Sequence, residues 1–148
     1  MNDTDELYQQ VILEHNRHPR HFYELTDCTH QAEGHNPLCG DHYHVFLCVS
    51  DGGTIEDISF TGTGCAISKA SLSIMTDALV GKSVDQAKET FEQFHQLVLG
   101  QCEDHTGLGK LTVFEGVAKF PTRVKCAVLG WHTLVGALDR RQEAVLTE

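Results

Sequence analysis

Apolar residues at helical spacing open the chain. Leu7, Val11 and Ile12 fall on one face of a helix, which is the pattern of an amphipathic helix packed against a core. Thr4 is the expected N-cap of this helix. The helix should end before Pro19, because a residue that precedes a proline avoids the helical region. The segment ends with three histidines that we expect at the surface: His15, His18 and His21.

Alternation of apolar and polar residues predicts strands in the next part of the chain. The alternating positions of the clearest strand are Tyr43, Val45, Leu47 and Val49. Asp51-Gly52-Gly53 is a turn signal, so the run 54–61 is the expected hairpin partner. The pattern is weak in residues 25–35, where a further strand could lie.

Helical patterns dominate the second half of the chain. A helix of small residues is predicted over 66–80, with Cys65 at its start and Gly81 at its end. Ser83 and Gln86 have the spacing of a capping box. That box opens a helix over 84–99, and residues 100–109 form a polar loop.

The last segments are a short apolar helix over 111–117, a break at Phe120-Pro121 and a final helix from about Cys126 to Val145. Strand–helix–strand units do not repeat. We therefore expect a single α+β domain over residues 1–148. It should have a small antiparallel sheet of about three strands, with helices packed on one face.

Composition and net charge argue against several classes of function. The chain has 148 residues, 41% of them hydrophobic, and a formal net charge of −10. Nucleic-acid binding needs a basic face, which this balance does not favour. No apolar run is long enough to span a membrane. The acidic N-terminus lacks the basic and apolar regions of a signal peptide. We therefore expect a cytoplasmic protein that binds neither nucleic acid nor membrane.

Six cysteines point to metal or sulfur chemistry. In a reducing compartment, thiols are metal ligands or redox groups more often than disulfides. Cys39 and Asp41 stand two positions apart, so in extended chain both side chains point to the same side. Gly40 gives the turn between them its conformational freedom. The alternative is a buried turn cysteine beside an aspartate that caps the turn.

Cys65 and Cys126 are both expected at helix starts. Free amide groups at a helix N-terminus stabilise a thiolate. Arg123 and Lys125 stand beside Cys126 and could support the negative charge of a thiolate site. The alternative interpretation is two small buried residues and a solvated basic pair. The remaining cysteines, Cys28, Cys48 and Cys102, are expected to be packing or incidental residues.

Three thiolates and a carboxylate form a donor set that suits zinc, and thiolate-rich sites also hold iron–sulfur clusters. The predicted ligands are therefore Cys39, Asp41, Cys65 and Cys126. His42 and His44 lie close in sequence and are alternative ligands. The sequence has no CxxC pair, HExxH helix, GxSxG elbow or phosphate-binding glycine loop.

Four stretches carry a family resemblance that covers nearly the whole chain. They are LY at 7–8 with HNRHPR at 15–20, NPLCGD at 36–41, GCAISKAS at 64–71 and FPTRVKCA at 120–127. On these motifs the chain resembles the U-type iron–sulfur cluster assembly family, which includes IscU, SufU and the N-terminal domain of NifU. The resemblance implies a NifU/IscU-like fold and a metal or cluster on the cysteines of these motifs.

Two features resemble the SufU branch. Lys125 stands where the classical scaffolds have a histidine, and the segment between Cys65 and Cys126 is longer than in those scaffolds. The SufU resemblance implies tightly bound zinc and acceptance of sulfur from a SufS-like cysteine desulfurase. The sulfur would then pass to a downstream iron–sulfur scaffold or acceptor protein.

Cys39 is the expected persulfide acceptor of such a zinc-dependent sulfurtransferase. It lies in a turn beside Gly40 and can move at lower conformational cost than a cysteine held at a helix start. The family resemblance implies the same choice. Two alternatives remain: a scaffold that assembles and transfers a 2Fe–2S or 4Fe–4S cluster on the same residues, and a structural zinc domain that serves only as an adaptor.

Overall fold

The computed structural model describes the backbone of residues 3–101, 107–139 and 145–146, and the side chains of residues 8–101 and 107–139. In chain order its elements are α1 (Asp3–Arg17), β1 (His30–Asn36), β2 (Asp41–Val49), β3 (Ile55–Thr63), α2 (Ala66–Leu79), α3 (Val84–Val98), the 3₁₀ helix η1 (Gly109–Lys119), α4 (Pro121–Leu138) and β4 (Val145–Leu146).

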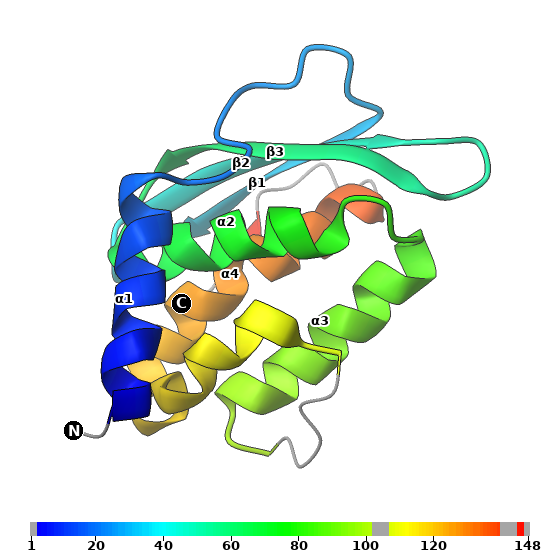
Figure 1. Cartoon of the computed structure of the whole chain (residues 1–148). Coiled ribbons are helices and arrows are strands. Elements are labelled where there is room, and N and C mark those ends of the chain that lie inside the picture. The colour runs from blue at the N-terminus through cyan, green and yellow to red at the C-terminus, as the bar shows by residue number, and fades with distance from the viewer. Residues whose placement is uncertain (1–2, 102–106, 140–144, 147–148) are drawn as a thin grey trace.

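The sheet forms one layer of the molecule. Its strand order is β3-β2-β1-β4. β2 pairs antiparallel with β1 and β3, and the short β4 runs parallel to β1. Figure 1 shows the labelled helices together on one side of the sheet. The predicted α+β class, with three antiparallel strands and helices on one face, is confirmed, and β4 adds a short edge strand.

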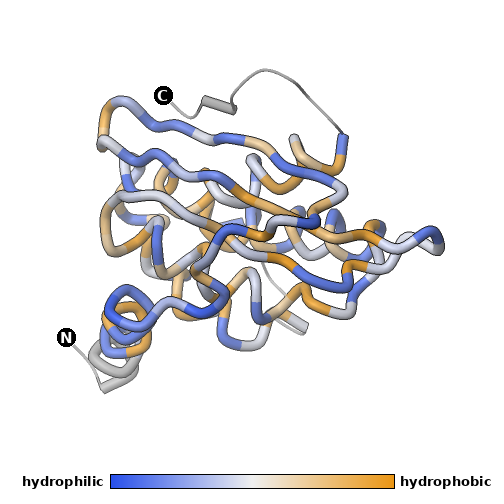
Figure 2. Tube along the Cα trace, turned by 90° about the horizontal axis from the view of Figure 1, so that it is seen from above, coloured by the Kyte–Doolittle hydropathy of each residue, from blue (hydrophilic) through white to orange (hydrophobic). Residues whose placement is uncertain are grey.

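The core lies between the sheet and the helices. Strand residues alternate between the two faces, and Figure 2 shows polar and apolar residues interspersed along the chain trace. The inward side chains of β2 and β3 meet α2 and α4. Among the completely buried residues are Val45, Leu47, Ile58, Phe60, Leu72, Met75, Trp131 and Leu134.

The helix boundaries correct three predictions. α1 already includes Thr4, so Thr4 is not its N-cap. α4 begins at Pro121 rather than at Cys126, because the fixed φ of proline suits the first turn of a helix and its missing N–H is not needed there. α4 ends at Leu138, and Val145 belongs to β4. Cys126 therefore lies inside α4, away from the free amide groups at its start.

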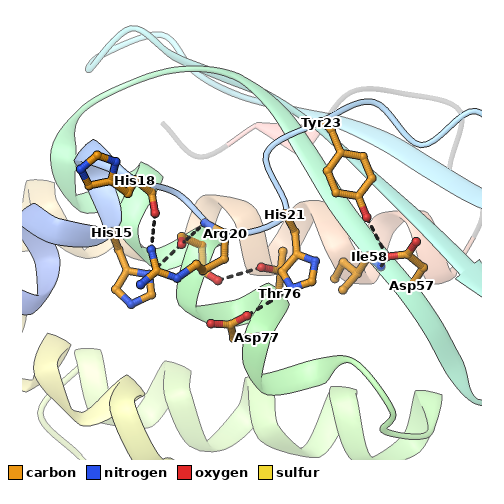
Figure 3. A network of polar contacts seen from close by, with 10 residues as sticks. His15, His18, Arg20, His21, Tyr23, Asp57, Ile58, Thr76 and Asp77 are labelled. Carbon is orange, nitrogen blue, oxygen red and sulfur yellow. Dashed lines mark hydrogen bonds and ion pairs between the residues drawn. The ribbon is translucent and has the colours of Figure 1, made fainter.

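The segment between α1 and β1 crosses an edge of the sheet and is tied to α2 (Figure 3). Ser73 Oγ lies 2.7 Å from His15 Nδ1 and accepts a hydrogen bond from the Arg20 amide at 2.8 Å. His21 Nε2 pairs with Asp77 Oδ1 at 3.1 Å. The prediction that His15 lies at the surface is wrong, since its side chain is almost completely buried.

The described helices differ from membrane-spanning segments in length and apolarity. None of those within residues 3–101 and 107–139 is both long and apolar enough to cross a membrane.

Candidate metal centre

Three segments that are distant in sequence meet at one end of the sheet. They are the turn between β1 and β2, the start of α2 and the second turn of α4. Donor atoms from the β1–β2 turn and α4 converge: one ligand atom each from Cys39, Asp41 and Cys126 lies within 4.8 Å of the other two. The described cysteines are free thiols, and the sixth, Cys102, lies outside the described residues.

The β1–β2 turn holds Cys39 at the edge of the centre. Asn36 is completely buried. Its Oδ1 accepts a hydrogen bond from the Leu38 amide at 3.2 Å, and its backbone oxygen accepts one from the Cys39 amide at 3.3 Å. Gly40 has φ +75°, a conformation that favours glycine. The turn is thus ordered by Asn36, while the Cys39 side chain stays half-buried.

Asp41 is the buried carboxylate of the centre. Its side chain is 0% exposed. Oδ1 accepts a hydrogen bond from the Cys65 amide at 2.9 Å, whereas Oδ2 has no hydrogen-bond partner among the described residues. A buried carboxylate oxygen without a partner is costly unless a cation binds it. This oxygen is therefore suited to a metal ion.

Gly64 makes room for this arrangement. A Cβ atom there would lie 2.4 Å from Tyr43 Oη, 2.6 Å from Asp41 Oδ1 and 2.7 Å from Ser68 Oγ. Contacts of this length do not occur in folded proteins, so a larger residue would displace all three groups. The absence of a side chain at position 64 lets Asp41 reach the Cys65 amide.

Cys65 is the N-cap of α2, as predicted. Its Sγ accepts a hydrogen bond from the Ser68 amide at 3.4 Å. Ser68 Oγ in turn lies 2.9 Å from the buried Tyr43 hydroxyl. A hydrogen bond from the Cys126 side chain, aided by the Ser68 amide and opposed by burial, lowers the pKa of Cys65 to about 6. In the metal-free centre the lowered pKa favours the thiolate on Cys65 rather than on Cys126.

Cys126 is the deeply buried thiol. Its Sγ lies 3.3 Å from Cys39 Sγ and 3.6 Å from the Thr122 carbonyl oxygen. The hydrogen bond to the Cys65 thiolate, burial and the contact with Cys39 all raise the pKa of Cys126. The expected helix-start stabilisation of a Cys126 thiolate is wrong, because α4 begins five residues earlier.

Positive charge reaches the centre from the exposed first turn of α4. The Cys65 thiolate and a hydrogen bond with Cys126 raise the pKa of Arg123. Lys125 is half-buried and immediately precedes Cys126. The charge-support role of Arg123 and Lys125 stays a prediction.

The donors fit a thiophilic metal. Zinc binds thiolate sulfur at about 2.3 Å, so two sulfurs on one tetrahedral ion lie about 3.8 Å apart. The Sγ atoms of Cys39 and Cys126 are 3.3 Å apart, and a carboxylate oxygen of Asp41 lies within 4.8 Å of both. Cys65 is not one of these three closely spaced donors. It adjoins the group through its hydrogen bond with Cys126.

Sequence reasoning missed the residues that support the donors. Asn36, Tyr43, Gly64 and Ser68 order the turn and hold Cys65 and Asp41 in place. One signal was available: Ser68 stands three residues after Cys65, which is the spacing of a side-chain cap. His42 and His44 are not in the convergent donor group that the described residues form.

Comparisons with known proteins agree on the family. The model of the NifU-like N-terminal domain matches residues 7–127. The iron–sulfur cluster assembly scaffold protein IscU of Streptococcus pyogenes is 40% identical over 97% of this chain and 90% of its own length. The zinc-dependent sulfurtransferase SufU of Bacillus subtilis is 40% identical over 89% of each chain.

A solved structure gives the same result for the fold. The crystal structure of a SUF-system iron–sulfur cluster assembly scaffold protein from Fervidobacterium islandicum is 33% identical, with a TM-score of 0.84 over 90% of this chain and 97% of that one. The fold, the convergent thiols and the matched sequence motifs lead to one conclusion: this chain belongs to the family of NifU-like N-terminal domains.

Proposed function

We propose that this chain is a zinc-dependent sulfur acceptor for iron–sulfur cluster assembly, with Cys39 as the residue that takes up the sulfur. The observation that carries the proposal is the position of Cys39. Its half-buried thiol lies on a turn, 3.3 Å from the Cys126 sulfur and within 4.8 Å of a carboxylate oxygen of Asp41. Such a thiol can bind the metal ion and can also dissociate from it to react.

Cys39, Asp41, Cys65 and Cys126 would hold the zinc ion. When bound, zinc keeps its thiol ligands deprotonated at neutral pH. Arg123 would offset part of the negative charge that three thiolates and a carboxylate bring together. The completely buried Asp41 and Cys126 would fix the ion from the side of the protein core.

The transfer step is a thiol–persulfide exchange. The Cys39 thiolate attacks the outer sulfur of a persulfide on the donor protein. A new sulfur–sulfur bond forms on Cys39, the donor's sulfur–sulfur bond breaks, and the electron pair leaves with the donor cysteine as a thiolate. Cys39 is left as a persulfide that a second acceptor can attack in the same way.

Cys39 suits this step better than the other two thiols. Cys65 carries the negative charge in the metal-free centre, but the Ser68 amide holds its sulfur at the start of α2. Cys126 is completely buried. Cys39 lies in a turn, where a change of backbone angles costs less than it does inside a helix.

A cysteine desulfurase is the proposed sulfur donor, and an iron–sulfur scaffold or acceptor protein is the proposed recipient. The name of the SufU relative, a zinc-dependent sulfurtransferase, supports this assignment. The surface next to the centre offers room for a partner. A largely apolar groove of about 600 Å³ is lined by residues of α1, α2, η1 and the start of α4, among them Ile67, Phe120 and Arg123, and Leu38 beside Cys39 is 71% exposed.

A cluster scaffold is the second candidate. The 40% identity to the IscU scaffold protein over 97% of this chain favours it, and the same donors could hold the iron of a growing cluster. Anaerobic purification with metal analysis separates the two. A colourless protein with one zinc supports the sulfur acceptor, and a coloured protein with iron and acid-labile sulfide supports the scaffold.

The direct test maps the accepted sulfur. The zinc-loaded chain is incubated with a cysteine desulfurase and cysteine, and peptide mass spectrometry then locates the added sulfur. We expect it on Cys39 in the wild type and expect it to be lost in Cys39→Ser. Cys28→Ser, which removes a half-buried thiol outside the centre, is the matched control. Sulfur on Cys65 or Cys126 in the wild type, or full acceptance by Cys39→Ser, contradicts the proposal.

A further inference from the structure

The hairpin that carries Cys39 and Asp41 also carries imidazoles on its opposite face. Neighbouring residues of a strand point to opposite sides of the sheet. Asn36 and Asp41 form the last pair of the β1–β2 ladder and are buried on the helix side. The next pair, His35 and His42, therefore points to the outer side, away from the helices.

His35 and His42 lie as two ligands of one ion would. They are directly opposite each other in the register of β1 and β2. Their ring centroids are 5.1 Å apart and the rings are tilted by 37°. Because an imidazole nitrogen binds zinc at about 2.0–2.1 Å, two rings that share an ion at roughly 90–110° have centroids about 5 Å apart.

A carboxylate lies beside this pair; the donor atoms of the three residues do not all lie within 4.8 Å of one another, so a bound ion would have to draw the exposed side chains together. Glu33 Oε2 lies 3.9 Å from His42 Nε2, close to the roughly 3.4 Å expected for two donors on one tetrahedral ion. The side chains of Glu33 and His42 are 52% and 58% exposed, so both can adjust. His44, on the same face, is engaged elsewhere: its Nε2 lies 2.9 Å from Gln31 Oε1 and its ring stacks on Phe46.

We propose that His35, His42 and Glu33 form a second metal site, which takes a divalent transition ion such as Zn²⁺ or Ni²⁺. Imidazole with one carboxylate suits these ions, in contrast to the thiol-rich centre on the other face of the hairpin. The exposed donors leave the remaining coordination positions to water, so the ion exchanges readily with solvent. The net charge of −10 favours any cation at this surface.

The test is a calorimetric titration of the zinc-loaded full chain with Ni²⁺, while a chromogenic chelator reports any zinc released from the thiol centre. We expect one Ni²⁺ per chain and no zinc release. His35→Gln and His42→Gln should each weaken Kd at least about tenfold, because a single imidazole loses the benefit of chelation. Glu33→Gln should weaken Kd by a smaller factor.

His44→Gln is the matched control, since it removes an imidazole from the same face and should leave Kd within about twofold of the wild type. All four substitutions are on the outer face of the sheet, and circular dichroism checks that each variant is folded. Absence of Ni²⁺ binding, stoichiometric zinc release, or equal loss in His44→Gln and His35→Gln would overturn the proposal. These readouts do not depend on sulfur acceptance, so this site and the proposed function can fail separately.

Discussion

Gly64 offers the sharpest test of how the metal centre is built. In Gly64→Ala the new Cβ would stand 2.4 Å from Tyr43 Oη, 2.6 Å from Asp41 Oδ1 and 2.7 Å from Ser68 Oγ. All three residues are buried, so these atoms have no free space into which they could move aside. The substitution must therefore displace the carboxylate and the hydroxyl pair.

The expected cost follows from these contacts. Forcing an extra methyl group into a packed site costs about 1–3 kcal/mol, and weakening the hydrogen bond from the Cys65 amide to Asp41 adds about 1 kcal/mol. The lower entropy of the unfolded alanine chain offsets about 0.5–1 kcal/mol. We expect a net loss of about 1–3.5 kcal/mol, which for a chain of this size lowers Tm by roughly 3–11 °C.

The assay is urea unfolding of the metal-free protein, with zinc content measured on the purified holoprotein. Gly116→Ala is the control, because a Cβ there meets nothing within 4 Å and its φ lies outside the left-handed region. It should leave stability unchanged or slightly raised. If Gly64→Ala stays within about 0.5 kcal/mol of the wild type and keeps full zinc, the close packing around Asp41 is not what holds the centre.

Four further predictions concern the donors. Cys65→Ser and Cys126→Ser should each lower zinc content and Tm, because structural zinc contributes on the order of 10 kcal/mol of apparent binding energy; full zinc in both variants, measured by elemental analysis, refutes the assignment. Asp41→Ala should speed zinc exchange with a chelator, since the hard carboxylate oxygen changes how a thiol-rich set of ligands holds the ion. An unchanged exchange rate together with an unchanged sulfur-transfer rate counts against this role. In metal-free protein at pH 7, iodoacetamide should label Cys65 before Cys126, because the pKa of Cys65 is about 6 and that of Cys126 is raised. The folded pKa of Cys65 lies below its ordinary value of 9.0, so the stabilisation by its thiolate is complete above pH 9 and is lost as the pH falls through about 6. A flat pH–stability profile between pH 6 and 9 contradicts that pKa.

Local patterns determined most of the elements. The capping box at Ser83 and Gln86 is present as predicted, and Cys65 does begin α2. These features depend on residues within one turn of each other, so the sequence contains all the information they need. The alternating apolar residues of β2 likewise predict a strand with one buried face, because only that arrangement removes them from water.

Predictions that depended on distant contacts were incomplete. Phe120-Pro121 reads locally as a break, yet Pro121 is the first residue of α4. The polar strand β1 has little periodicity of its own and forms because it pairs with β2 along seven positions. His15 looks like a surface residue by type, but its ring is buried beside Ser73 of α2, 58 positions later in the chain.

The same division applies to the metal centre. The sequence alone determined the chemical types: a cysteine and an aspartate two residues apart around a glycine, and two further cysteines placed by their motifs. Only the tertiary structure decided that Cys126 approaches Cys39 to 3.3 Å across 87 positions, and that one buried oxygen of Asp41 has no hydrogen-bond partner in the described part of the chain. The physical reason is that local spacing fixes the direction of neighbouring side chains, whereas the packing of α4 and α2 against the sheet fixes the distances between donors on different elements.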